Sequence, residues 1–160
     1  MVGAYGAGKT TLARDLGAAT GLPVHHLDAA RWAQGWALRP REEWLHEVDE
    51  VLAGDRWIVD GNFEATLDRR LAACDTAIFL DFPMLLSARR VVRRRLSRAH
   101  RPDLPDGVVE RLNLRLLGLL RDYPRTVRPE LVRLLSDHAD VIVLRSPEDV
   151  AEFVRRVQRL

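Results

Sequence analysis

The 160-residue chain has a single cysteine, Cys74, so it cannot form an internal disulfide. Such scarcity of cysteine is typical of proteins in a reducing compartment. No run of apolar residues is long enough to span a membrane, and the first residues show no signal-peptide pattern. We therefore expect a cytoplasmic protein with no membrane partner.

Internal repeats and low-complexity segments are also absent from the sequence. The composition, 47% hydrophobic and 30% charged, is ordinary for a folded domain that buries a core. At this length one core is sufficient, so we expect a single domain over residues 1–160.

Basic residues are distributed unevenly. Lys9 is the only lysine, and no acidic residue lies between Asp81 and Asp103. That interval nevertheless holds seven arginines, at positions 89, 90, 93, 94, 95, 98 and 101. Because the net charge of the whole chain is only +2, this local excess indicates an anionic partner: phosphate groups, nucleic acid or an acidic protein.

Residues 3–10 read Gly-Ala-Tyr-Gly-Ala-Gly-Lys-Thr and fit the phosphate-binding loop G-x-x-x-x-G-K-[ST] at every fixed position. Glycines allow successive backbone N–H groups to surround an anion, Lys9 places its charge on the β/γ-phosphates, and the Thr10 hydroxyl is a ligand for Mg²⁺. The alternative, a glycine-rich turn that caps a helix, uses fewer of these residues. The sequence thus predicts a nucleoside triphosphate site formed by Gly3, Gly6, Ala7, Gly8, Lys9, Thr10 and Thr11.

Beyond this loop, short apolar runs alternate with segments of helical periodicity. Strands are expected at 24–27, 56–60, 76–80 and 140–144, a loop at 29–38, and helices at about 9–20, 40–54, 63–73, 83–99, 108–121, 129–136 and from 147 onward. This alternation predicts a parallel sheet covered by helices on both faces. Ligands of such sheets bind at the carboxyl ends of the strands, which is where Asp28, Asp60 and Asp81 fall.

The first strand does not fit this pattern, because only Met1 and Val2 precede Gly3 whereas a strand normally has about five or six residues. We therefore expect that this chain lacks several N-terminal residues of the functional protein. An intact-mass measurement on protein from its native source tests that expectation.

Several segments together resemble the adenylate-kinase-like P-loop kinases, closest to the branch known as DNA topology modulation protein. They are the phosphate loop, Leu27-Asp28 with Trp32 and Trp36, residues 57–63 (Trp-Ile-Val-Asp-Gly-Asn-Phe), Leu80-Asp81-Phe82-Pro83, Arg101-Pro102-Asp103 and Tyr123-Pro124. The resemblance implies a three-layer α/β/α P-loop NTPase fold with a five-stranded parallel sheet in the order 2-3-1-4-5, its first strand truncated. It also implies a short arginine-bearing lid at about 98–115, and ATP with Mg²⁺ as the phosphoryl donor. Tyr5 departs from the pattern, because these loops usually have a small residue there.

The resemblance also suggests roles for two acidic residues. Asp60 is similar to the acid that holds Mg²⁺ through water, although it could instead only begin the Asp-Gly-Asn turn. Asp28 ends the second expected strand, where kinases that act on hydroxyl groups keep an acid to orient the acceptor. Its alternative role is the N-cap of a helix. Asp81 could equally cap the helix that follows Pro83.

Four arginines are further candidates. Arg101 and Arg111 flank the lid loop and resemble the lid arginines that close over the transferring phosphate. Arg90 and Arg94, four residues apart, resemble the pair near the ATP base and phosphates. For any one of the arginines in that helix, a solvated surface position is the alternative.

The remaining candidates are aromatic. His25 and His26 are interpreted as structural residues rather than zinc ligands, because no further ligand lies at a suitable spacing. Trp32, Trp36 and Trp44 either wall an acceptor pocket or belong to the core.

The sequence therefore predicts an ATP-dependent kinase that acts on a small molecule, either a nucleotide or a hydroxyl compound. A nucleic-acid-binding regulator that is switched by nucleotide and affects DNA topology is the second possibility, and a kinase-derived scaffold without turnover is the third.

Overall fold

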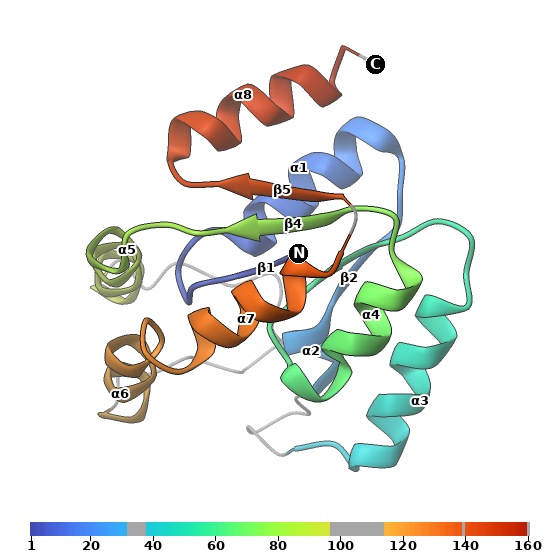
Figure 1. Ribbon diagram of the computed structural model, residues 1–160, viewed down its shortest axis with the longest axis horizontal. Helices are drawn as coiled ribbons and strands as arrows, with labels where there is room; N and C mark the ends of the chain where they lie inside the picture. Colours follow the sequence, from blue (N-terminus) through green and yellow to red (C-terminus); the bar gives the residue numbers. More distant parts are fainter. Residues whose placement is uncertain (32–37, 97–113, 139, 160) are drawn as a thin grey trace.

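The computed structural model describes residues 1–31, 38–96, 114–138 and 140–159 (Figure 1). The strands are β1 (Val2–Gly3), β2 (Val24–His26), β3 (Ile58–Asp60), β4 (Ala77–Leu80) and β5 (Val141–Leu144). The helices are α1 (Lys9–Thr20), α2 (Leu27–Arg31), α3 (Arg41–Leu52), α4 (Leu67–Ala73), α5 (Met84–Leu96), α6 (Leu114–Asp122), α7 (Val127–Ser136) and α8 (Pro147–Val157), with a 3₁₀ turn, η2 (Glu64–Thr66).

All strand pairs among the described residues are parallel, and they form two hydrogen-bonded sheets, β1-β4-β5 and β2-β3. The Met1 backbone lies at the junction: its nitrogen donates to Val59 O at 2.5 Å, and its carbonyl accepts from the Gly61 N–H at 3.2 Å. The junction thus brings β1 beside β3. The α/β fold with parallel strands agrees with the sequence prediction, whereas the five-strand order 2-3-1-4-5 is not confirmed as one sheet.

Helices lie on both sides of the strands. Figure 1 shows α8 above β5 and β4, and α7 below β1. Helix α1 packs against α8 and β3. Apolar residues from these layers form the main core, which includes Leu12, Leu67, Leu80, Leu131 and Phe79. Helices therefore cover the strands on both faces, as we predicted from the alternation of apolar strands with amphipathic helices.

A smaller second core lies around β2 and β3 and contains Leu27, Trp44, Val48 and Val59. Trp44 is 2% exposed, and its ring lies 5.0 Å from that of Phe63 at a tilted angle. It therefore belongs to this core, which was one of its two expected positions.

Several element boundaries differ from the sequence prediction. The second strand ends at His26 instead of Leu27, because α2 begins at Leu27 and takes the first residues of the expected 29–38 loop. The third begins at Ile58 instead of Arg56, and the segment expected as a helix over 63–73 opens with the 3₁₀ turn before α4. Residues 32–37, and most of the lid predicted at 98–115, lie outside the described residues.

Burial of the Met1 ammonium, with the charge of Arg70 as a second cause, lowers its pKa from 8.0 to about 5. The unfolded chain takes up this proton as pH falls below 8, whereas the folded protein takes it up only near pH 5. The free energy of unfolding should therefore decrease as pH falls from 8 to 5, by about 4 kcal/mol over the whole window.

Urea unfolding between pH 5 and 8 measures this dependence, with Nα-acetylated chain as the matched control because its terminus does not titrate. We expect the difference in stability between the two forms to vary with pH across this window. A constant difference would show that the terminus is solvated in the folded protein.

Candidate active site

The phosphate loop connects β1 to α1 through residues 4–8. Gly6 has φ of 80°, and a Cβ at this position would lie 2.5 Å from Val91 Cγ2 and 2.7 Å from Ser87 O on α5. Gly8, with φ of 99°, precedes α1, whose N-terminus has no side-chain cap. Both glycines are therefore needed for the backbone path, which leads from the loop into the N-terminus of α1, the end of a helix that favours an anion.

Lys9, the first residue of α1, turns back over its own loop. Its Nζ donates to Gly3 O at 3.0 Å and to Ala4 O at 3.1 Å, and lies 5.8 Å from the centre of the Tyr5 ring. The only lysine side chain of the protein thus places its charge at the loop, with Tyr5 beside it.

Thr10 and Asp60, the two predicted metal ligands, lie side by side. Asp60 ends β3 and is 4% exposed, and its Oδ2 accepts from the Thr10 hydroxyl at 3.0 Å. The residues are 50 positions apart in sequence, and the pairing places a buried carboxylate next to the first turn of α1. Hydroxyl and carboxylate oxygens are the ligands that Mg²⁺ takes from proteins when phosphates complete its shell. These residues therefore fit a magnesium ion.

His26 is a third member of this group, and the sequence analysis gave it no role in the site. Its Nδ1 lies 2.6 Å from Asp60 Oδ1, so each Asp60 oxygen has a side-chain partner. The parallel pairing of β2 with β3 sets His26 directly opposite Asp60. Its place at the end of a strand, two residues before Asp28, is the signal that could have identified it.

Asn62 is a second residue that sequence reasoning missed. Its side-chain amide pairs with the Gly3 backbone in both directions: Oδ1 accepts from the Gly3 N–H at 3.0 Å, and Nδ2 donates to Gly3 O at 2.8 Å. Buried Arg70 donates to Gly61 O at 2.8 Å and Phe63 O at 3.0 Å on either side of it. The Asp-Gly-Asn turn therefore fixes the start of the phosphate loop as well as presenting Asp60.

A cleft of about 770 Å³ opens beside the loop, between α1, α5 and α8. Arg90 borders it, donates to Ala7 O at 3.2 Å, and lies with its guanidinium 5.1 Å from the centre of the Phe82 ring. Thr11, Arg93 and Arg94 line the same cleft. Both predicted nucleotide-binding arginines, Arg90 and Arg94, thus border the cleft beside the loop.

Other predicted site residues are placed differently or lie outside the described residues. Asp81 forms a two-point ion pair with Arg128 of α7, with distances of 2.7 and 2.8 Å, which gives it a structural partner. Asp28 is the second residue of α2, and this helix begins directly after β2. Arg101, Arg111, Trp32 and Trp36 lie outside the described residues.

Within the described residues no group of three or more His, Cys, Asp and Glu side chains could hold a metal ion. None of the helices in that part of the chain is long and apolar enough to cross a bilayer.

Because Lys9 is the only lysine, an acyl-phosphate derivative of ATP has a single side-chain amine to acylate. We expect it to label Lys9, and excess unmodified Mg·ATP to suppress that labelling, because both compounds would place phosphates at the loop. Peptide mass spectrometry locates the modification, and an acyl phosphate without adenosine is the control. Labelling that ATP does not suppress would contradict a nucleotide site here.

The geometry is that of an α/β fold with parallel strands and a glycine-rich loop between β1 and α1. No family model matches the chain, and no curated protein matches it. Among solved structures, one similar fold is that of a gluconokinase from Sinorhizobium meliloti 1021, with a TM-score of 0.58 and 18% sequence identity. The match covers 99% of this chain and 87% of that protein. The similarity is one of fold, and it agrees with the α/β arrangement of parallel strands in the described residues.

Proposed function

We propose that this protein is an ATP-dependent phosphotransferase that moves the γ-phosphate of Mg·ATP to a small-molecule acceptor. The observation that carries the proposal is the contact of Thr10 with buried Asp60 at the first turn of α1, directly below the phosphate loop. The same site holds Lys9, so a cation and two oxygen ligands meet where a triphosphate would lie. The name of the structurally similar protein, a gluconokinase, supports the same class of reaction.

Each residue would contribute positioning or charge neutralisation, which phosphoryl transfer requires more than covalent chemistry. Lys9 and the loop N–H groups would hold the β- and γ-phosphates, and Thr10 and Asp60 would hold Mg²⁺. Bound Mg²⁺ supplies neutralisation of the charge that develops between the two phosphates. The candidate nucleotide-cleft arginines are Arg90 and Arg94, and we assign lid roles to Arg101 and Arg111 on the resemblance of the sequence to adenylate-kinase-like enzymes.

The acceptor is proposed to carry a hydroxyl group. Asp28 lies in α2, two residues after His26, which ends β2 and contacts Asp60. A hydroxyl must lose a proton when it attacks phosphorus, so a carboxylate at that position could accept the proton as a general base. A phosphate acceptor is already anionic and does not require such a base. A nucleoside monophosphate is the alternative acceptor, and the DNA topology modulation branch is the finer family proposal.

The nucleic-acid reading rests on the seven arginines of residues 89–101. Arg90 argues against it, because its guanidinium donates to the phosphate loop and borders the nucleotide cleft. A salt titration of DNA binding distinguishes the two functions, since contacts with several phosphates make affinity fall steeply as salt rises.

ADP formation from Mg·ATP tests the kinase proposal directly. The acceptor panel contains nucleoside monophosphates in one arm and polyhydroxy acids, sugars and small alcohols in the other. Turnover that a hydroxyl compound stimulates supports the proposal and its acceptor class. Stimulation by a nucleoside monophosphate alone would replace the acceptor class, and ATP binding without turnover under any condition would leave the regulatory function.

A further inference from the structure

The carboxylate of Asp60 is held through both of its oxygens by residues of two different elements. Its Oδ2 accepts from the Thr10 hydroxyl of α1 at 3.0 Å, and its Oδ1 lies 2.6 Å from His26 Nδ1 at the end of β2. The terminal torsion of an aspartate side chain is broad, so a single contact leaves the carboxylate free to turn. Two contacts on separate oxygens fix its orientation.

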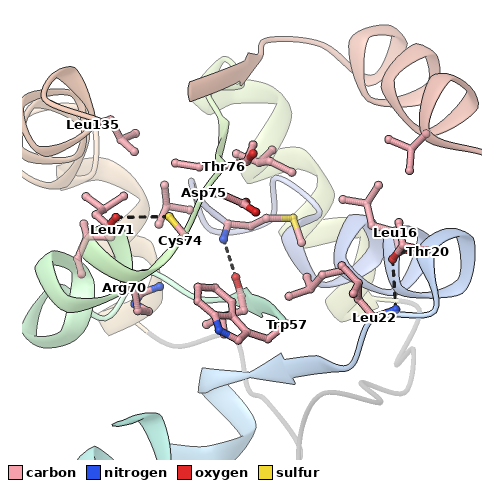
Figure 2. Close-up of a pocket in the computed structure, with 18 of the residues that line it drawn as sticks. Leu16, Thr20, Leu22, Trp57, Arg70, Leu71, Cys74, Asp75, Thr76 and Leu135 are labelled. Carbon is pink, nitrogen blue, oxygen red and sulfur yellow. Dashed lines mark hydrogen bonds between the residues drawn. The ribbon is translucent and has the colours of Figure 1, made fainter. Parts of the chain in front are cut away.

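Arg70 fixes the backbone that follows this side chain. Figure 2 shows Arg70 in the wall of a cavity of about 270 Å³. From there its guanidinium donates to Gly61 O at 2.8 Å and to Phe63 O at 3.0 Å, in the turn after Asp60. Neither Asp60 nor His26 lines that cavity. The main freedom that remains to Asp60 is therefore rotation of its carboxylate, and His26 restricts this rotation.

Strand register places His26 for this contact. β2 and β3 pair in parallel, with His26 directly opposite Asp60 and His25 opposite Val59. Because side chains alternate between the two faces of a strand, His25 lies on the other face of β2. The side chain of His26 is 17% exposed and that of Asp60 is 5% exposed, so little water competes for the bond between them. Of the two adjacent histidines, His26 is the one that the fold directs to the carboxylate.

The proton of this bond belongs to His26. A carboxylate oxygen accepts hydrogen bonds, so Nδ1 is the donor. The separation of 2.6 Å is short for a nitrogen donor, as hydrogen bonds to ionised groups are. A carboxylate has about four lone-pair sites, and the bonds from His26 and Thr10 use two of them. Asp60 can therefore keep both partners while it takes up a metal ion.

We propose that His26 is a positioning residue for the metal ligand Asp60. Through Nδ1 it holds Oδ1, so that Oδ2 stays beside the Thr10 hydroxyl at the first turn of α1. A carboxylate that is already oriented loses less conformational entropy when it binds a metal, and substitution of such a supporting residue typically weakens metal binding by about 10- to 100-fold. The inference rests on the proposed function, since it concerns the Mg²⁺ site that Thr10 and Asp60 would form.

Binding of Mn²⁺ to the full chain, with a non-hydrolysable ATP analogue present, tests this role without turnover. Electron paramagnetic resonance measures the free Mn²⁺. His26→Asn keeps an amide N–H near the position of Nδ1, whereas His26→Gln places it near that of Nε2 and His26→Leu has none. We expect the Leu and Gln variants to bind Mn²⁺ at least about tenfold more weakly, and the Asn variant to recover most of the affinity. His25→Leu, on the opposite face of β2, is the matched control and should leave binding unchanged.

Asp60→Asn separates this inference from the proposed function. It should weaken Mn²⁺ binding itself, and addition of His26→Leu to it should have little further effect, because the histidine acts through the carboxylate. Unchanged binding in Asp60→Asn would overturn the metal site and the positioning role together.

Three other results would overturn the positioning role alone. They are a loss of binding in Asp60→Asn with none in His26→Leu, a full further loss in the double variant, and equal losses in His26→Asn and His26→Gln. If the His26→Leu chain does not fold, the comparison of the Asn and Gln variants decides, because both keep a polar amide and differ in where its N–H lies.

Discussion

Replacement of Lys9 by alanine is expected to lower acceptor-stimulated turnover of Mg·ATP by about 10³-fold or more. The Lys9 ammonium lies on the phosphate loop itself, within 3.1 Å of the Gly3 and Ala4 carbonyl oxygens. As the γ-phosphoryl group leaves, negative charge grows on the β/γ-bridging oxygen and its neighbours. A cation fixed at the loop stabilises that charge more than it stabilises ground-state ATP, so its loss raises the barrier.

The fold should survive this substitution. Lys9 is part-buried and donates hydrogen bonds to backbone carbonyls of its own loop, and removal of these bonds should lower the free energy of unfolding by only about 1–2 kcal/mol. Steady-state ADP formation measures the loss of turnover, and thermal unfolding by circular dichroism measures the stability of the same preparation.

Arg14→Ala is the matched control, because Arg14 lies on the same helix with an exposed side chain and does not border the cleft. It removes one cation from α1 and should leave turnover unchanged. Lys9→Arg keeps the charge in a planar group of different shape, and should recover only part of the rate. Full turnover in Lys9→Ala would rule out phosphoryl transfer at this loop.

The path of the glycine-rich loop could be predicted from the sequence because the interactions that form it are local. Gly6 and Gly8 adopt positive φ within a single turn, and Lys9 bonds to carbonyls five and six residues away. Asp60 could be predicted because a buried apolar run ended at it, and the carboxyl end of a strand is an edge shared with the loop. In both cases the information lies in a few neighbouring residues.

The rest of the site depends on pairings across the chain. His26 meets Asp60 only because β2 and β3 align in one register, and Asn62 meets Gly3 across 59 residues. Asp81 shows the converse. From the sequence, this carboxylate at the end of a strand could be a metal ligand or a helix cap, whereas in the structure it pairs with Arg128, 47 residues away. Neither periodicity nor residue type specifies such partners, because strand register and helix docking select them.

Asp60→Asn is expected to reduce Mg²⁺-dependent turnover by about 10²–10³-fold and to raise the Mg²⁺ concentration needed for half-maximal rate. The substitution keeps the shape of the side chain and an oxygen that can accept from the Thr10 hydroxyl, now observed at 3.0 Å. It removes the negative charge, which a divalent cation requires of its few protein ligands. Rates measured across a Mg²⁺ titration, with ATP held saturating, give both quantities.

Asp55→Asn is the matched control, because Asp55 is exposed in the turn before β3 and the same chemical change there should alter neither quantity. The two readings of Asp60 then separate. If Asp60 only begins the Asp-Gly-Asn turn that holds Gly3, Asp60→Asn would lower the Tm and leave the Mg²⁺ dependence as it was. If the carboxylate helps to hold the metal, the Mg²⁺ concentration needed for half-maximal rate rises even where the Tm is unchanged. The Tm can stay unchanged because Asn62 still bonds to Gly3. Arg70 likewise still bonds to Gly61 and Phe63.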